Sequence, residues 1–187
     1  MGYSLLLQTQ NPSWLYSVYQ GATTIWERWN SYTLETGFGK VAMNSFNHYA
    51  YGSVLEWVYK YVAGIDTDAN IAGYKHIVLR PMPDTRKKSE LPEGQSKITW
   101  VRAKYDSVSG TIESAWSVED GLFTYEATVP EGTVASVHIP VFDKNAKTIV
   151  INGVVHSTEE YEVKELSCVK CYVIDCAPGK YTFEIMM

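Results

Sequence analysis

The stretch TIESAWSVEDGLFTYEATV, residues 111–129, has the pattern of a strand, a turn and a second strand. Residues 111–118 and 122–129 are rich in β-branched and aromatic side chains, which pack well on a pleated sheet. Between them, Glu119-Asp120-Gly121 is a hairpin signal, because Asp and Gly tolerate the positive φ angles of a tight turn. The stretch therefore predicts an antiparallel hairpin.

The segments around this hairpin have similar patterns. Asn152-Gly153 is a second strong signal for a tight turn. Further strands are expected at residues 75–80, 97–105, 133–139, 147–151, 171–174 and 181–185. Short strands at intervals of about ten residues are typical of two packed sheets. The sequence therefore predicts an antiparallel β-sandwich in this part of the chain.

The N-terminal part has a different character. Pro12–Tyr19 is expected to be a short helix, with Asn11 as its N-cap and Pro12 at its first position. Residues 22–29 and 31–43 contain glycines or β-branched residues without a helical period, so they are expected to be irregular or extended. Little regular structure is therefore predicted between this helix and the next.

The strongest helix signal comes after these segments. This helix should begin at Ser45 or Asn47, either of which can cap it, and run to Ala63, where Gly64 provides a stop. Apolar side chains cover all but a narrow strip of its surface, so the helix should be buried between layers. On its own it would expose a large apolar face, which predicts self-association into a homo-oligomer.

The composition excludes several classes of protein. With 187 residues, 45% of them hydrophobic and 20% charged, the chain is expected to fold. Its net charge of −5 argues against a nucleic-acid partner, and no apolar run is long enough for a membrane span. It has no glycine-rich phosphate loop, so no cofactor is expected. The 14 Tyr and 6 Trp suit either a surface that meets carbohydrate or Tyr-rich sandwich strands.

The three cysteines do not have the pattern of a metal site. Cys168, Cys171 and Cys176 lack a fourth ligand at the spacing of a zinc site, so no metal is expected. They are interpreted as free buried thiols. Free thiols, and the absence of a signal-peptide pattern at the N-terminus of this chain, favour a cytoplasmic location.

Three of the four histidines have structural interpretations. His76 and His138 fall in predicted strands, and His156 follows a turn. None has a serine or cysteine partner at a suggestive spacing, so a Ser-His-Asp triad has no support from the sequence. The fourth histidine, His48, lies in a different context.

The candidate site lies in residues 20–51, where Glu27 stands between Trp26 and Trp29 and His48 follows downstream. A carboxylate between indoles has two interpretations. In a core, the indoles pack and the acid needs a partner, since an unpaired buried charge is costly. In a cleft, the indoles form a platform for a sugar ring and the acid does chemistry.

Several motifs follow one another along the chain. They are WERW (26–29), SFNHYAYG (45–52), YVAGI (61–65), GYKHI (73–77), AKYDS (103–107) and YEATVP (125–130). In this order the motifs resemble bacterial α-L-rhamnosidases of glycoside hydrolase family 78. The likeness covers most of the chain and weakens after about Phe142.

The resemblance implies a fold and a division of the chain. Residues 1–72 would be the C-terminal segment of an (α/α)6 catalytic barrel, contributing about two or three of its helices. Residues 73–187 would be a C-terminal β-sandwich domain. The expected fold class is therefore mainly β with an N-terminal α portion: a remnant of an (α/α)6 barrel followed by an antiparallel β-sandwich.

The resemblance also implies an activity, the inverting hydrolysis of terminal α-L-rhamnose from glycosides. Glu27 matches the family's general base, and His48 matches a histidine that hydrogen-bonds rhamnose. Trp26 and Trp29 would shape the subsite for this rhamnose-containing carbohydrate. The family's general acid lies upstream of the matched region, so the isolated chain is expected to be inactive. Asn30 departs from family members that carry Asp there, which removes a negative charge near Glu27.

Two functional hypotheses follow. In the first, the chain derives from an inverting α-L-rhamnosidase and carries one half of its catalytic pair. In the second, it is a non-catalytic β-sandwich module with a structural or weak carbohydrate-binding role. The second hypothesis requires aromatic side chains exposed on a face of the sandwich, for which Trp100 and Trp116 are candidates.

Overall fold

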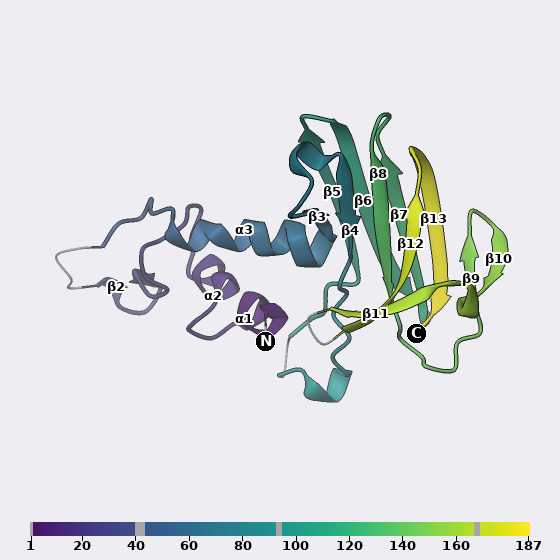
Figure 1. Cartoon of the computed structure of the whole chain (residues 1–187). Coiled ribbons are helices and arrows are strands. Elements are labelled where there is room, and N and C mark those ends of the chain that lie inside the picture. The colour runs from purple at the N-terminus through teal and green to yellow at the C-terminus, as the bar shows by residue number, and fades with distance from the viewer. Residues whose placement is uncertain (1, 40–43, 93–94, 167–168) are drawn as a thin grey trace. The chain divides into compact units, whose positions relative to one another are not determined.

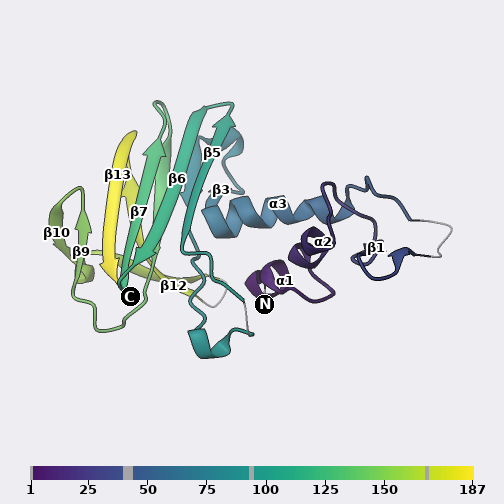
Figure 2. The same cartoon turned by 180° about the vertical axis from the view of Figure 1, so that it is seen from behind.

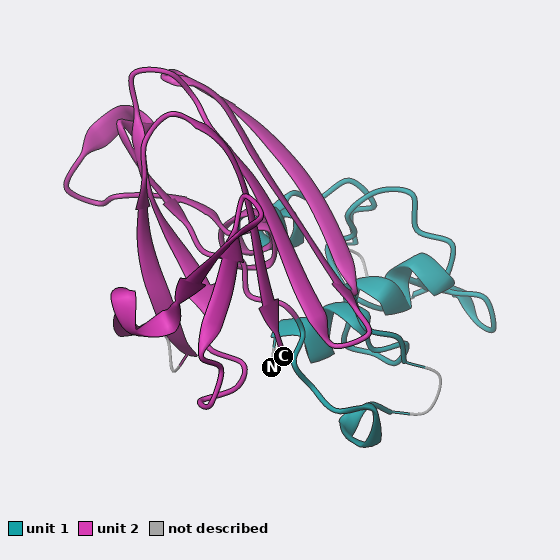
Figure 3. Cartoon of the chain, turned by 90° about the vertical axis from the view of Figure 1, so that its right-hand side faces the viewer, with its two compact units in different colours: residues 1–56, 84–98 teal, residues 57–83, 99–187 magenta. Residues whose placement is uncertain are grey.

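The computed structural model describes residues 2–39, 44–92, 95–166 and 169–187 (Figure 1). The chain forms two compact units, one of residues 1–56 and 84–98 and the other of residues 57–83 and 99–187 (Figure 3). The first unit holds short helices and a small hairpin, and the second holds two larger β-sheets. The predicted fold class, mainly β with an N-terminal helical portion, is confirmed.

The second unit is a sandwich of two sheets, which Figures 1 and 2 show from opposite sides. Along the six-stranded sheet the order is β10 (Val154–Ser157), β9 (Thr148–Ile151), β13 (Gly179–Met186), β7 (Leu122–Val129), β6 (Gly110–Glu119) and β5 (Trp100–Ser107). Along the five-stranded sheet the order is β11 (Glu162–Leu166), β12 (Val169–Cys176), β8 (Val134–Pro140), β4 (His76–Leu79) and β3 (Ile65–Thr67). Neighbouring strands pair antiparallel, except that β4 and β8 are parallel.

The hairpin predicted at residues 111–129 is formed by β6 and β7. Its turn places Asp120 at φ 49° and Gly121 at φ 81°, so both turn residues have the positive φ angles that a tight hairpin turn needs. The turn between β9 and β10 has the same character, with Asn152 at φ 50° and Gly153 at φ 80°. Both turn predictions are confirmed.

Alternate side chains of the strands fill the space between the two sheets, as the period of two predicts. In β6 the inward side chains include Trp116, which is 3% exposed and donates from Nε1 to the Val62 carbonyl oxygen at 2.7 Å. Ser114 donates from its hydroxyl to the Ala63 carbonyl oxygen. These two bonds satisfy carbonyl groups at a helix end, where intrahelical partners are missing. Trp116 is therefore a core residue and not an exposed aromatic.

Two strands of the five-stranded sheet were absent from the sequence prediction. β3 has three residues, too few to show an alternating pattern, and β11 has the sequence EVKEL, whose charges hide its strand character. Both lie at sheet edges, where charged side chains are common in strands. The sheet thus includes residues 65–67, directly after Gly64. Short 3-10 helices occur at η3 (Ala72–Tyr74), η4 (Lys88–Glu90) and η5 (Thr158–Glu160).

The first unit begins with two short helices, α1 (Gly2–Leu7) and α2 (Trp14–Tyr19). The prediction of Asn11 as the cap of the second helix is wrong. Ser13 is the N-cap, because its hydroxyl accepts a hydrogen bond from the Leu15 amide at 3.1 Å. The segment 31–43 contains the hairpin of β1 (Tyr32–Thr33) and β2 (Gly37–Phe38) within its described residues.

Helical turns run from Ala50 to Ala63 as η1 (Ala50–Ser53), α3 (Val54–Trp57) and the π-helical η2 (Val58–Ala63). The predicted start at Ser45 or Asn47 is wrong, because residues 45–48 bond to residues 25–27 instead. The predicted stop is confirmed: Gly64 has φ 82° in the left-handed region. Val62 and Ala63 are buried, whereas Leu55 is exposed. The helix is therefore only partly buried, and not buried on all sides as predicted.

His138 on β8 is 7% exposed, and its Nδ1 atom has no hydrogen-bond partner in the described part of the chain. Burial, together with the charges of Arg80 and Lys164, lowers the pKa of His138 from 6.5 to about 4. His76 acts in the same direction and Asp175 in the opposite one. Between pH 6.5 and about pH 4, His138 is therefore protonated in the unfolded chain but neutral in the folded chain.

We expect the free energy of unfolding to fall as the pH drops from 6.5 to about 4, by about 2–3 kcal/mol from His138. Above pH 6.5 this contribution to stability is fully present. His138→Gln removes the titrating group, so the variant should lose this part of the pH dependence in urea unfolding. The control is His156→Gln, which changes a partly exposed histidine paired with Glu160. Equal pH dependence in the wild-type chain and the His138 variant would contradict the expectation.

Candidate functional site

Two segments of the first unit lie side by side, residues 24–27 and residues 45–48. The Glu27 amide donates to the Ser45 carbonyl oxygen at 2.9 Å, and the His48 amide donates to the Ile25 carbonyl oxygen at 2.8 Å. The Thr24 hydroxyl donates to the Phe46 carbonyl oxygen. These bonds bring the segments that carry Glu27 and His48 together, although they are separated in the sequence.

The carboxylate of Glu27 is held by one of these segments. The Ser45 amide donates to Glu27 Oε2 at 2.7 Å, which is the length of a charge-assisted hydrogen bond. Glu27 is half-buried, and no hydrogen bond reaches its Oε1 atom from the described residues. One oxygen is therefore fixed while the other can accept a proton.

His48 has one ring nitrogen in use. Its Nδ1 atom accepts a hydrogen bond from the Ala50 amide at 3.3 Å, and its ring stacks on Tyr49 at 5.6 Å between centroids. Because Nδ1 is an acceptor, the hydrogen-bond network assigns the ring proton to Nε2. No described residue bonds to Nε2, so this atom is a free donor.

The two tryptophans beside Glu27 have different surroundings. Trp26 is 7% exposed and packs edge-to-face on Tyr32 and Phe46 at 6.4 and 5.4 Å between ring centroids. Trp29 stacks parallel on Tyr51 at 3.9 Å. Trp26 is therefore mainly a packing residue in this structure, and Trp29 is the more accessible of the pair.

Trp29 belongs to an aromatic hollow of about 290 Å³ in the first unit. Trp14 meets Trp29 edge-to-face at 4.8 Å and donates from Nε1 to the Tyr51 carbonyl oxygen at 2.9 Å. Thr23, Thr24 and Ser17 also line the hollow, whereas Glu27 does not. Trp14 and Tyr51 are site residues that the sequence did not predict: Tyr51 lies within the SFNHYAYG motif, and Trp14 carries no signal beyond its residue type.

A second cluster has the order of a catalytic triad. His76 Nδ1 lies 2.8 Å from Asp68 Oδ2, and His76 Nε2 lies 2.9 Å from the Ser136 hydroxyl. The Ser136 hydroxyl, however, donates to Asp175 Oδ1 at 2.9 Å. Its single proton is thus directed away from the imidazole, and a serine nucleophile needs that proton on its histidine base. The cluster is a hydrogen-bonded link between strands of the five-stranded sheet.

The cysteines in the described part of the chain are free and buried. Burial raises the pKa of the Cys171 thiol to about 11 and that of Cys176 to about 12, so both stay protonated at neutral pH. Cys168 lies outside the described residues. Among the described residues, no group of three or more His, Cys, Asp or Glu side chains could hold a metal ion.

Comparison with known proteins assigns this chain to a family of glycoside hydrolases. Residues 1–62 match the family model of the bacterial alpha-L-rhamnosidase 6 hairpin glycosidase domain, and residues 64–153 match that of the bacterial alpha-L-rhamnosidase C-terminal domain. The chain belongs to the bacterial α-L-rhamnosidase family. In the described part of the chain, no helix is both long enough and apolar enough to cross a membrane.

Curated relatives and solved structures agree with this assignment. An alpha-L-rhamnosidase of Formosa agariphila is 36% identical over 97% of this chain, and one of Streptomyces avermitilis is 41% identical over 75%. The chain spans only 18% and 12% of the length of these relatives. The crystal structure of the Streptomyces avermitilis enzyme complexed with L-rhamnose matches 98% of the chain with a TM-score of 0.74 at 34% identity. That match covers 16% of the solved chain.

Proposed function

We propose that this chain supplies the general base, Glu27, of an inverting α-L-rhamnosidase. The observation that carries the proposal is the position of the Glu27 carboxylate. The Ser45 amide fixes its Oε2 atom, and its Oε1 atom has no partner among the described residues. The segment that carries Glu27 is hydrogen-bonded to the segment that carries His48. The aromatic hollow around Trp29 supports a sugar-binding role, since flat apolar rings suit the apolar face of a pyranose.

In this mechanism a water molecule attacks the anomeric carbon of the rhamnosyl unit. Glu27 Oε1 takes a proton from this water as the water oxygen bonds to the anomeric carbon. At the same time a second carboxyl group protonates the leaving oxygen as the glycosidic bond breaks. Inversion requires about 6.5–9.5 Å between the two carboxyl groups, which leaves room for the water. The Nε2 proton of His48 would bond a sugar hydroxyl and orient the ring.

The second carboxyl group, the general acid, is proposed to lie outside these 187 residues. None of the described contacts of Glu27 involves another carboxyl group. Because general acid catalysis contributes about 10²–10⁴-fold, the 187-residue chain alone should be inactive. The division of the chain between residues 72 and 73 into a barrel segment and a sandwich domain remains a prediction.

The stereochemistry of the first product tests the proposed mechanism. An enzyme that contains this chain and the remainder of its catalytic domain should release β-L-rhamnose first from p-nitrophenyl α-L-rhamnopyranoside, as followed by proton NMR. Initial release of the α-anomer would overturn inversion. Turnover by the 187-residue chain alone, abolished in Glu27→Gln, would mean that the acid lies within this chain.

The isolated chain is expected to self-associate through apolar side chains of its first unit. Leu55, Phe38, Leu34 and Tyr49 are exposed there, and apolar surface on this scale favours association. Light scattering should give a mass above that of one chain, and Leu55→Glu should lower it. Val155→Glu, on an exposed strand of the sandwich, is the control. A monodisperse monomer would contradict this expectation.

A second candidate function is a non-catalytic module with weak carbohydrate binding. Trp100 favours it, because this side chain is 66% exposed on β5. Trp116, the other candidate, is buried in the sandwich core. Carbohydrate binding through Trp100 is compatible with a catalytic role of Glu27, since the two residues belong to different units of the chain.

A further inference from the structure

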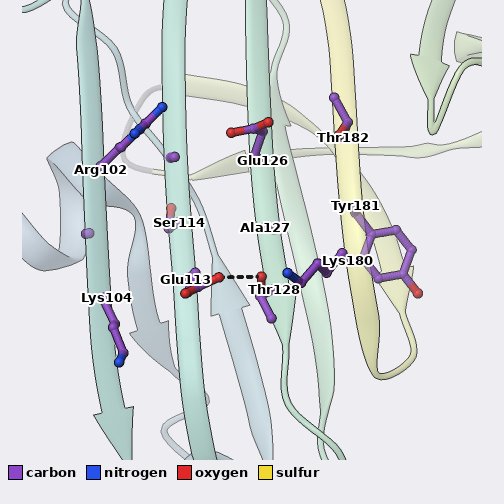
Figure 4. A pocket seen from close by; sticks show the side chains of 12 residues that line it. Arg102, Lys104, Glu113, Ser114, Glu126, Ala127, Thr128, Lys180, Tyr181 and Thr182 are labelled. Atoms are coloured by element: carbon purple, nitrogen blue, oxygen red, sulfur yellow. Dashed lines mark hydrogen bonds between the residues drawn. The ribbon is translucent and has the colours of Figure 1, made fainter.

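The outer face of the six-stranded sheet contains a groove. One hollow of about 460 Å³ lies over β5, β6, β7 and β13, and a neighbouring hollow of about 440 Å³ lies over β5, β6 and β7. Both are lined by Arg102, Ala115 and Glu126, so they form one continuous groove. Figure 4 shows the charged side chains of the first hollow standing on four neighbouring strands.

The register of the strands explains why this face is hollow. Ala115 lies between Arg102 and Glu126 in one row across the sheet, and Ser117 lies between Trp100 and Thr124 in the next. The short side chains of Ala115 and Ser117 therefore form a floor on β6, and the longer side chain of Glu126 stands beside it on β7. Long side chains form the walls, with Trp100, Arg102 and Lys104 on β5 and Lys180 on β13.

The groove has unpaired hydrogen-bonding groups of both kinds. Within the described part of the chain, Arg102, Glu126 and Lys180 make no hydrogen bond or ion pair through their side chains, whereas Glu113 accepts one from Thr128 at 2.9 Å. The two hollows are lined by equal numbers of cationic and anionic side chains, Arg102, Lys104 and Lys180 against Glu113, Glu119 and Glu126. Lys104 pairs with Asp106 at 3.6 Å, and Arg102 and Lys180 make no ion pair within the described part of the chain. A balanced set of donors and acceptors suits an uncharged ligand with many hydroxyl groups.

Trp100 adds a flat apolar surface at one end of the groove. Its side chain is 66% exposed, and no aromatic ring of the described residues stacks on it. The distance from the row of Trp100 to the row of Lys104 is four residues along β5, or roughly 13 Å. This length accommodates more than a single sugar ring. A pyranose can stack on the indole while its neighbours meet the polar groups.

We propose that this groove is a non-catalytic binding site for a neutral oligosaccharide, with Trp100 as the stacking platform and Arg102 and Glu126 as the main hydrogen-bonding groups. The site lies on the second unit and uses none of the residues assigned to hydrolysis. It would hold a polymeric substrate on the protein independently of the reaction, so its failure would leave the role of Glu27 untouched.

Titration of the 187-residue chain with an α-linked L-rhamnose tetrasaccharide and with cellotetraose, followed by calorimetry and amide NMR, tests the groove. At least one of these neutral probes should bind and shift the amide signals of residues 100–104 and 113–128. Trp100→Ala should weaken that binding at least tenfold, equivalent to about 1.4 kcal/mol. Glu126→Gln, which keeps the shape of the side chain, should also weaken it.

Two control variants assign the binding to the groove. Val155→Ala changes an exposed residue on β10 and should leave affinity unchanged. Val163→Ala changes an exposed residue on β11 of the five-stranded sheet and should also leave it unchanged. Three results would overturn the proposal. The first is binding that is lost in Trp29→Ala, in the hollow of the first unit, but not in Trp100→Ala. The others are tighter binding of tetragalacturonic acid than of either neutral probe, and the absence of amide shifts in the groove with either neutral probe.

Discussion

Glu27→Gln should lower the turnover of an α-L-rhamnoside by about 10²–10⁴-fold in an enzyme that contains this chain with the rest of its catalytic domain. The substitution keeps the size of the side chain, and its amide oxygen can still accept the Ser45 hydrogen bond. The amide cannot take a proton from water, so the loss should fall on kcat. Release of p-nitrophenol from p-nitrophenyl α-L-rhamnopyranoside measures it.

Two comparisons separate a lost base from a disturbed fold. Glu35→Gln changes an exposed carboxylate of the same unit and should leave the rate within about twofold. Glu27→Ala should regain activity with azide, which attacks without losing a proton and fits the space of the missing carboxylate. A Glu27→Gln enzyme with unchanged turnover would remove Glu27 from the mechanism.

Gly64→Ala should destabilise the sandwich unit by about 4 kcal/mol or more, at the upper end for single substitutions. Gly64 has φ 82°, and a Cβ atom built on it would lie 2.2 Å from the Pro81 nitrogen and 2.3 Å from the Arg80 carbonyl carbon. Those neighbours are backbone atoms and cannot rotate away. The chain is also held there by the Arg80 amide, which donates to the Gly64 carbonyl oxygen at 2.7 Å.

Gly132→Ala is the matched control for this clash. Gly132 has φ 74°, but nothing lies within 4 Å of its Cβ position. The free energy of unfolding of Gly132→Ala should therefore fall by only about 1–2 kcal/mol, the cost of placing a residue other than glycine at a positive φ angle. Urea unfolding followed by tryptophan fluorescence compares the two variants. Equal losses would mean that the close approach of Pro81 has no energetic cost.

The sandwich was predictable where its signals are local. In β6 and β7, alternating side chains and an Asp-Gly turn predict the same hairpin, and the structure has both. The helix stop at Gly64 was predictable for the same reason, since a left-handed C-terminal residue is usually glycine. Signals of this kind depend on a few adjacent residues and need no knowledge of the partner strand.

The helix start and the extra strands were not predictable in this way. Ser45 and Asn47 are good caps by residue type, but the backbone of residues 45–48 is bonded to residues 25–27, so the helix begins at Ala50. β3 and β11 are strands because the five-stranded sheet has edges to extend, not because their sequences alternate. In each case a distant segment competes with local preference.

The family resemblance, the sandwich and the choice of Glu27 as a candidate could all be predicted from the sequence, because motifs and turn signals consist of consecutive residues. The burial of Trp26 and Trp116, and the accessibility of Trp29 and Trp100, became apparent only in the three-dimensional fold. The same residue type serves both purposes, since an indole gains as much from a packed core as from a ligand. Which of these surroundings each tryptophan has depends on segments far away in the chain.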